Sequence, residues 1–382
     1  MTASPSASAS DPPRAPEPRA PEPRAPEFGE PAPLFSAPTD GIAAYSLDVV
    51  AGRHVVLMAF GSLGLDACAK AHGEVLARRG LFDDRRALFF GVTADRADRI
   101  DRGLRNAAPG LRYFDDFDLR VMHLYGLVRN DSLQPAIFLL DPMLRVIAAE
   151  PVEATGAVLD QLEAALAAEA GAADAGFAPV LEVPRVFEPA FCAELIAYYR
   201  NSQSEESGFA VEADGRTVNR ADPRFKRRRD VTITDPRLRE QTRERLRERL
   251  LPMLVRAWGW RGREIERDLI ACYDARDQGF FSAHRDDATP GTAHRQFAVT
   301  INLNPTEYQG GELRFPEFGR RLYKPPTGGA VVFGCGLLHE ALPVLAGVRY
   351  AVVPFLYDEA GSNIRRAYLE RTGQDNAEPA TF

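Results

Sequence analysis

The chain lacks the features that would place it in several large classes of protein. Its 382 residues include only four cysteines, which are scattered and form no CxxC pair, so neither a disulfide framework nor a structural zinc site is expected. No apolar run approaches the roughly 18 residues needed to span a bilayer, and no basic patch leads into an apolar N-terminal stretch. The formal net charge of −7 argues against wholesale nucleic-acid binding. We expect a soluble, cytoplasmic protein with no membrane or nucleic-acid partner.

The N-terminal segment, residues 1–28, contains Ser, Ala and Pro and then a repeated Arg-Ala-Pro-Glu-Pro unit. Dense proline removes backbone donors and prevents a regular helix. Because the segment has almost no apolar side chains, burial cannot offset its ordering entropy. We therefore expect a disordered tail of polyproline-II character.

Residues 29–168 alternate apolar strand-like runs with helical stretches. The predicted strands cover 55–60, 87–92, 136–140 and 146–148, and the predicted helices cover 67–79 and 155–170. The last two strands form a hairpin across Asp141-Pro142. This order predicts an α/β domain with a mixed sheet and flanking helices. An Ala/Gly/Asp-rich stretch makes 169–178 a predicted linker.

Beyond the linker, residues 179–360 show a different pattern. Helices are predicted over 189–200 and from Asp235, which suits an N-cap and is followed by Pro236 in a first-turn position. Short strands are then predicted over 268–273, 297–303, 312–315, 330–333 and 349–356. Helices feeding a run of short strands predict a jelly roll with supporting helices. We expect residues 361–382 to be a C-terminal tail.

Three side chains in this second region have the chemistry of a metal centre. His284 and Asp286 are two residues apart at a strand end, so they point to the same face. His339 lies 53 residues after Asp286 and supplies a second imidazole. Two imidazoles and one carboxylate leave three positions open, which suits a non-haem Fe(II) oxygenase. His294 has no partner at ligand spacing and is expected to lie outside the site.

A nearby cation and a phenol strengthen this interpretation. Arg349 lies ten residues after His339 on the next predicted strand. A cosubstrate that chelates iron through a 2-oxo acid end projects a second carboxylate away from the metal, and a guanidinium can bind that carboxylate through two hydrogen bonds. Tyr273 can donate a further hydrogen bond to the same carboxylate.

Several segments carry a family resemblance. In order they are Ala271-Cys-Tyr-Asp, Phe280-Phe-Ser-Ala-His284-Arg-Asp286, Ile301-Asn-Leu-Asn, Gly310-Gly-Glu-Leu-Arg-Phe315 and Pro326-Thr-Gly-Gly-Ala-Val-Val-Phe333. With His339 and Arg349, this set resembles the prolyl 4-hydroxylase branch of the 2-oxoglutarate/Fe(II) dioxygenases over about 180–360.

This resemblance implies a double-stranded β-helix (jelly roll), iron held by the His-Asp-His set, and O₂ and 2-oxoglutarate as cosubstrates, often with L-ascorbate. The implied reaction hydroxylates a peptide or small molecule and decarboxylates 2-oxoglutarate to succinate. Some relatives have a tyrosine at the position of Asn302 that helps bind 2-oxoglutarate, so Asn302 is a weak candidate for that contact. The substrate is not identified by the sequence, because this fold hosts many.

The first region carries a second resemblance. Gly29-Glu-Pro-Ala-Pro-Leu-Phe35, Gly91-Val-Thr-Ala-Asp95 and Ile137-Phe-Leu-Leu-Asp141 occur in order, with Cys68 at a helix start. Over about 29–150 the set resembles the peroxiredoxin and alkyl hydroperoxide reductase group. This implies a thioredoxin-like fold and places Cys68 at the peroxide-attacking position, where a helix N-terminus favours the thiolate. Gly61 and Leu65 replace the family's Pro and Thr, so the activity is less expected than the fold.

Three functions stay open. The first is an oxygenase that acts through the predicted iron centre. The second is a thiol peroxidase that uses Cys68, with the C-terminal domain regulatory. The third is a binding module in which both sites have degenerated.

A basic segment lies between Arg220 and Arg249. Its twelve Lys/Arg and six Asp/Glu give a local net charge of 12 − 6 = +6. The sharpest cluster includes Arg227, Arg228 and Arg229, which could line a substrate entrance and attract an acidic peptide or small molecule. The alternative is a solvated face with partial ion pairing.

Overall fold

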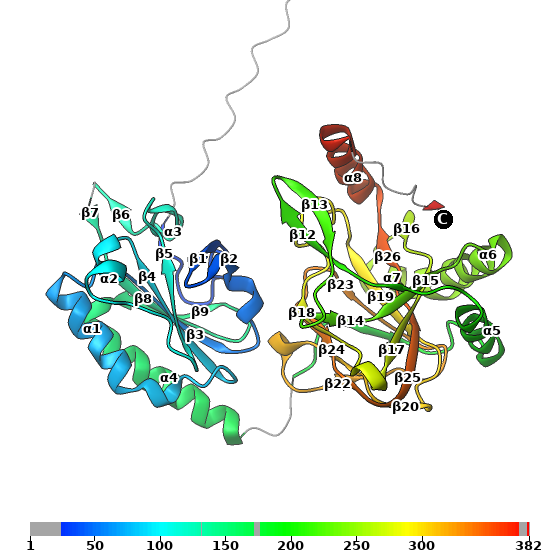
Figure 1. The fold of residues 1–382 in the computed structure, drawn as a ribbon, viewed down its shortest axis with the longest axis horizontal. Coiled ribbons are helices and arrows are strands. Elements are labelled where there is room, and N and C mark those ends of the chain that lie inside the picture. Colours follow the sequence, from blue (N-terminus) through cyan, green and yellow to red (C-terminus); the bar gives the residue numbers. More distant parts are fainter. Residues whose placement is uncertain (1–23, 131, 172–175, 374–379, 382) are drawn as a thin grey trace, which may run out of the picture.

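The computed structural model describes residues 24–130, 132–171, 176–373 and 380–381. It contains two domains, coloured blue to green and green to red in Figure 1. The first 23 residues of the predicted 1–28 tail lie outside the described residues. No helix within the described part of the chain is long and apolar enough to cross a membrane.

A seven-stranded sheet of order β2-β1-β5-β4-β3-β8-β9 forms the centre of the N-terminal domain. Its strands are β1 Ser36–Thr39, β2 Ile42–Ser46, β3 His54–Gly61, β4 Ala87–Thr93, β5 Leu111–Asp115, β8 Ala136–Leu140 and β9 Val146–Pro151. β3, β4 and β5 are parallel, whereas β8 is antiparallel to β3 and forms a hairpin with β9. Every residue of β3 and β4 is buried, as expected of central strands covered on both faces.

Helices and turns cover both faces of this sheet. α1 (Asp66–Ala77) and α4 (Thr155–Gly171) pack on one face, while the 3-10 turn η1 (Leu47–Val50) and α3 (Arg120–Leu124) pack on the other. The other short elements are η2 Arg79–Leu81, α2 Arg96–Ile100, β6 Val128–Arg129, β7 Ser132–Leu133 and η3 Val152–Ala154. This confirms the predicted thioredoxin-like α/β fold. Strands β1, β2 and β5 were not predicted, and each is only four or five residues long.

The predicted linker over 169–178 is shorter in the structure. α4 continues to Gly171, and Ala178 is already buried in the core of the next domain. Ala170, which was assigned to the linker, has high helix propensity and lies within this helix.

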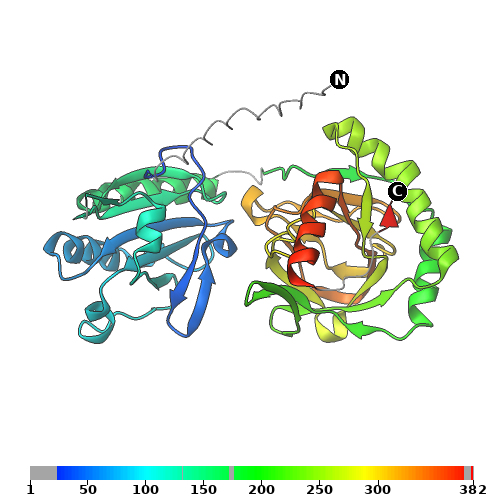
Figure 2. The same cartoon turned by 90° about the horizontal axis from the view of Figure 1, so that it is seen from above.

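Two sheets build the C-terminal domain, and Figure 2 shows its strands curling around a common centre. The larger, eleven-stranded sheet contains β10 Leu181–Val183, β11 Glu205–Glu206, β15 Arg229–Thr232, β16 Glu264–Glu266, β17 Leu269–Asp274, β19 Phe297–Asn302, β20 Tyr308–Gly310, β23 Ala330–Gly334, β25 Val344–Val352, β26 Phe355–Tyr357 and β27 Ala380–Thr381. The smaller has the order β14-β18-β24-β21-β22, with β14 Lys226–Arg227, β18 Phe280–His284, β24 His339–Ala341, β21 Leu313–Arg314 and β22 Leu322–Tyr323. A separate hairpin pairs β12 Phe209–Ala213 with β13 Arg216–Arg220. The paired sheets confirm the predicted jelly roll.

Helices support the larger sheet from outside, as Figure 2 also shows. They are α5 Pro189–Arg200, α6 Pro236–Arg245, a π-helical turn Leu246–Leu250 and α7 Leu251–Trp258. α6 begins as predicted, because the Asp235 side chain accepts a hydrogen bond from the backbone N–H of Leu238 at 2.9 Å. Apolar side chains of these helices and of the sheet form one hydrophobic cluster. Two 3-10 turns complete the domain, η5 Ala275–Asp277 and η6 Pro316–Phe318.

The prediction of a C-terminal tail over 361–382 is wrong for most of that range. Glu359–Thr372 form helix α8, which begins at the N-cap Asp358 and buries Tyr368. Ala380–Thr381 add β27 to the edge of β16. The helix has few apolar residues, so its sequence shows no clear helical periodicity from which it could have been predicted.

Candidate metal centre

The pairing of two short strands brings the predicted histidines together. β18 and β24 are antiparallel, and His284 is the register partner of His339. Their ring centroids are 4.3 Å apart. Asp286 follows β18 by two residues, and one ligating atom from each of the three side chains lies within 4.8 Å of the others. The structure therefore assembles the predicted triad from segments more than 50 residues apart.

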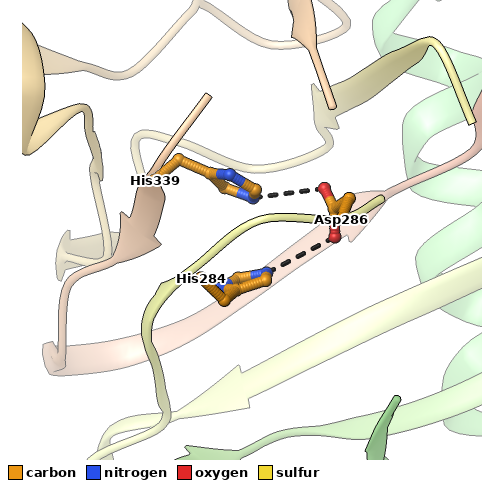
Figure 3. A group of neighbouring side chains, drawn as sticks. All are labelled: His284, Asp286 and His339. Carbon is orange, nitrogen blue, oxygen red and sulfur yellow. Dashed lines mark ion pairs between the residues drawn. The ribbon is translucent and has the colours of Figure 1, made fainter. Parts of the chain in front are cut away.

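Figure 3 shows both imidazoles pointing at the carboxylate of Asp286. His284 Nε2 lies 3.4 Å from Asp286 Oδ1, and His339 Nε2 lies 3.3 Å from Oδ2. The other ring nitrogens contact main-chain carbonyls: His284 Nδ1 is 2.8 Å from Ser282 O, and His339 Nδ1 is 3.0 Å from Leu337 O. A carbonyl can only accept, so each Nδ1 carries the proton. In a neutral ring, each Nε2 then directs a lone pair at Asp286.

The charge states of the triad suit a metal ion. Burial, reinforced by the neighbouring His284, lowers the pKa of His339 to about 4. Burial alone would raise the pKa of the Asp286 carboxyl, but the facing His339 and His284 rings hold it well below its usual range. Two Nε2 atoms facing a carboxylate form a stable arrangement when a proton or a metal cation lies between them. The donor set of two imidazoles and one carboxylate fits a non-haem Fe(II) ion, and both histidines are oriented through their second nitrogen.

A buried guanidinium forms another wall of the same cavity. Arg349 on β25 is 2% exposed and lines the cavity together with the triad. Its register partner on β17 is Tyr273, whose ring centroid lies 5.0 Å from the Arg349 guanidinium carbon. The Nε and Nη1 atoms of Arg349 have no hydrogen-bond acceptor among the described residues. A buried cation with unused donors is costly, and a carboxylate would satisfy it.

The structure places Thr300, which the sequence did not single out, in the lining of the cavity, and it places Asn302 and Tyr308 behind that lining. The Tyr308 hydroxyl on β20 is also buried without a partner among the residues described, and β20 pairs with β25, which carries Arg349. Thr300 on β19 lines the cavity directly. Asn302 is buried on the same strand but does not line it, and its amide donates to Pro325 O at 3.3 Å. Tyr308 is brought close to Arg349 by the pairing of β20 with β25, which no sequence motif predicts.

Of the three arginines predicted at an entrance, only Arg228 lines the cavity. Its guanidinium is buried and donates to Asp230 Oδ2 at 2.6 Å. Arg227 donates to the carbonyls of Pro223 and Asp277, and Arg229 donates to Ser204. These two arginines therefore hydrogen-bond to neighbouring segments and do not line the cavity.

Two other predicted side chains have structural partners. His294 Nε2 lies 2.8 Å from Glu266 Oε2, and Arg295 contacts the same carboxylate, so His294 lies outside the triad as expected. Cys68 is 0% exposed, and its thiol donates to Phe60 O at 3.3 Å. Burial, reinforced by Glu153 and Asp98, raises the pKa of Cys68 to about 11. The thiol therefore keeps its proton at neutral pH despite its place at the start of α1.

Comparisons with known proteins agree with this geometry. Residues 269–357 match the model of the 2OG-Fe(II) oxygenase superfamily. A PKHD-type hydroxylase of Synechococcus sp. (strain JA-2-3B'a(2-13)) is 33% identical over 94 residues, which are 23% of this chain and 41% of the relative. A PKHD-type hydroxylase of Thioalkalivibrio sulfidiphilus is 26% identical over 178 residues, 44% of this chain and 74% of the relative. The chain thus spans about two fifths of the length of the first of these relatives.

Solved structures resemble each half separately. A prolyl hydroxylase from Trichoplax adhaerens in complex with a hypoxia-inducible-factor peptide has 17% identity and a TM-score of 0.37, covering 49% of this chain and 86% of that one. A thiol peroxidase from Chromobacterium violaceum has 16% identity and a TM-score of 0.30, covering 37% of this chain and 89% of that one.

Proposed function

We propose that this protein is an Fe(II)- and 2-oxoglutarate-dependent hydroxylase whose chemistry takes place at His284, Asp286 and His339. The observation that carries the proposal is one cavity with two complementary walls. One wall directs two imidazole lone pairs and a carboxylate at a common point, and another holds a buried arginine with unused donors. The superfamily match over residues 269–357 supports the same conclusion.

The triad's part in this function is to hold the metal and leave positions open. His284 and His339 would bind through Nε2, with Nδ1 of each ring anchored to a main-chain carbonyl. Asp286 would supply the anionic oxygen. Iron(II) bound there would support the oxidation of substrate by O₂, coupled to the decarboxylation of 2-oxoglutarate to succinate and CO₂.

Arg349 orients the cosubstrate in this account. Its guanidinium would bind the carboxylate of 2-oxoglutarate remote from the metal, with the Tyr308 hydroxyl donating beside it. The Nε and Nη1 atoms of Arg349 and the Tyr308 hydroxyl are buried and have no hydrogen-bond partner among the described residues, so the site is preorganised for an anion. Tyr273 would pack its ring against the guanidinium.

Phe355, Val353, Arg228 and Arg267 also line the cavity and are candidates for contact with the substrate. We propose a peptide or small molecule as the substrate, and proline is the first residue to test, because the sequence motifs resemble those of the prolyl 4-hydroxylase branch. The requirement for ascorbate stays a prediction.

The proposal is tested by supplying Fe(II), O₂ and 2-oxoglutarate to the full chain and measuring succinate. Wild-type protein should form succinate, and Asp286→Ala should reduce its formation to the level without enzyme. Equal turnover by the variant would contradict the assignment. Mass spectrometry of prolyl peptides and small molecules incubated with the active enzyme would then identify the hydroxylated product as a gain of one oxygen atom.

A thiol peroxidase is not favoured. The Cys68 thiol is buried, hydrogen-bonded to a carbonyl and carries a raised pKa. A peroxide-attacking cysteine needs the opposite: an accessible thiolate.

A further inference from the structure

The two ligand histidines each have a neighbour that faces the N-terminal domain. Side chains alternate along an extended segment, so Ala283 and Leu338 point away from the centre that His284 and His339 face. Leu338 is 1% exposed and belongs to the same hydrophobic cluster as Leu47 of η1, and Ala283 packs against that cluster. The outer face of the ligand-bearing strands is therefore covered by the N-terminal domain.

An arginine ties the two ligand-bearing segments together. Arg285 lies between the two ligands of the first segment, and its Nη2 donates to Glu317 Oε1 at 2.8 Å. It also donates to Gly336 O, three residues before the second histidine. Glu317 Oε2 in turn accepts from the backbone N–H of Leu338 at 2.8 Å. One guanidinium and one carboxylate thus fix the backbone next to all three metal-ligand positions.

The N-terminal domain contributes the remaining charge of this network. Asp48 of η1 places Oδ2 3.6 Å from Arg285 Nε, and the Ser46 hydroxyl donates to its other oxygen. The Asp48 and Arg285 side chains are only 18% and 14% exposed. Gly52, just beyond η1, approaches Pro316 so closely that a Cβ at residue 52 would lie 2.4 Å from the proline Cβ. In Figure 1 the loop around η6 reaches toward the N-terminal domain at this point.

We propose that the N-terminal domain is a built-in clamp for the metal centre. By docking η1 and Asp48 on the back of the ligand-bearing strands, it holds the ligand segments in register and raises their affinity for the metal. The physical basis is that partners outside the ligand set orient the ligands, so metal binding does not have to order them. The inference rests on the proposed metal centre and gives the thioredoxin-like domain a role that needs no thiol chemistry.

The test is a titration of the full chain with Mn(II), which suits imidazole and carboxylate ligands and stays divalent in air. Asp48→Lys should weaken Mn(II) binding about tenfold, the lower end of the range for residues that support metal ligands. Asp48→Asn, which removes the charge without reversing it, should weaken binding about threefold, as for the loss of one partly exposed ion pair. Asp160→Asn is the matched control: Asp160 is an exposed carboxylate of α4 that pairs with Arg78 within the N-terminal domain. Its affinity should equal that of wild type.

Arg285 variants separate positioning from general stability. Arg285→Met should lose affinity, Arg285→Lys should recover part of it, and adding Asp48→Asn to Arg285→Met should cause little further loss. Fully additive losses would overturn the network. Thermal unfolding of each variant without metal identifies any that fail to fold. Asp48→Asn replaces one carboxylate oxygen by an NH2 group of similar size, so it is expected to fold and keeps the test decisive if Asp48→Lys does not.

Linkage supplies an independent readout. If docking favours metal binding, then metal binding must favour docking to the same extent. Mn(II) should therefore slow amide hydrogen exchange over residues 47–52 in wild type and Asp160→Asn, but much less in Asp48→Lys. Equal Mn(II) affinity in wild type and Asp48→Lys, or exchange over 47–52 that ignores Mn(II), would overturn the clamp alone. Failure of the wild-type chain to bind Mn(II) would overturn the proposed metal centre, and the clamp with it.

Discussion

In the N-terminal domain Cys68 lies near the start of α1, and in the C-terminal domain His284 lies at the end of β18. Both positions suggest reactivity from local structure alone. The surroundings differ: the Cys68 thiol is sealed in an apolar core with one carbonyl for a partner, whereas the His284 ring faces Asp286 and His339 across a cavity. Burial therefore keeps the proton on the thiol but leaves the imidazoles available as ligands.

This comparison shows that a reactive residue type at a favourable position does not make a site. The histidines gain their role from convergence, because strand pairing brings a second imidazole and an anion to the same point. Cys68 has no such convergence among the residues that the structure describes. Its neighbours Glu153 and Asp98 are acidic, and together with burial they oppose formation of the thiolate.

The largest effect is expected from removing a ligand of the triad. His339→Ala should lower the affinity for Fe(II) or Mn(II) by at least about a hundredfold, because even residues that only support ligands contribute roughly tenfold to a hundredfold. Equilibrium dialysis with metal analysis measures this directly. An affinity within a few-fold of wild type would show that His339 is not a metal ligand and would contradict the contrast between the triad and Cys68.

The next effect is expected at Arg349. Arg349→Gln should raise the KM for 2-oxoglutarate by more than about thirtyfold, since truncating one partner of a buried charge pair costs about 2 kcal/mol or more. Arg349→Lys should recover part of the loss, because lysine keeps the positive charge but cannot donate two parallel hydrogen bonds to one carboxylate. The metal affinity measured without 2-oxoglutarate should stay unchanged, and a matching fall in metal affinity would contradict the separation of the two walls.

Much of this site could be predicted from the sequence, because ligand spacing and glycine-rich motifs are local. The two-residue spacing of His284 and Asp286 already defines a common face, and the order of motifs adds His339 and Arg349. Tyr308 could not be predicted, because its place depends on the register of β20 against β25. The packing of η1 against the C-terminal domain could not be predicted from the sequence either, because it depends on contacts between the two domains.

A smaller effect concerns a buried amine next to the cavity. Burial, reinforced by Arg228, lowers the pKa of Lys226 to about 6, while its Nζ donates to Gly208 O at 2.6 Å. Between about pH 6 and pH 10 the unfolded chain holds a proton that the native lysine has lost, so native stability should rise with pH. Lys226→Met should remove roughly 1–2 kcal/mol of the gain between pH 7 and pH 9. Urea unfolding at the two pH values measures this, and equal gains in variant and wild type would contradict it.

The smallest effect is expected at Cys68. After treatment with peroxide at neutral pH, a sulfenic-acid trap should label native Cys68 slowly or not at all, because the thiol is buried and protonated. Mass spectrometry of the labelled peptide checks this, and chain unfolded in urea provides the control for an accessible thiol. Rapid native labelling would return the N-terminal domain to consideration as a redox enzyme.

The most direct test of the central claim compares both domains in one assay. Wild type, Cys68→Ala and His284→Ala are supplied with Fe(II), O₂ and 2-oxoglutarate, and succinate is measured. We expect wild type and Cys68→Ala to form succinate at equal rates, and His284→Ala to form none above background. Undiminished succinate formation by His284→Ala would contradict the assignment of the reaction to the C-terminal triad.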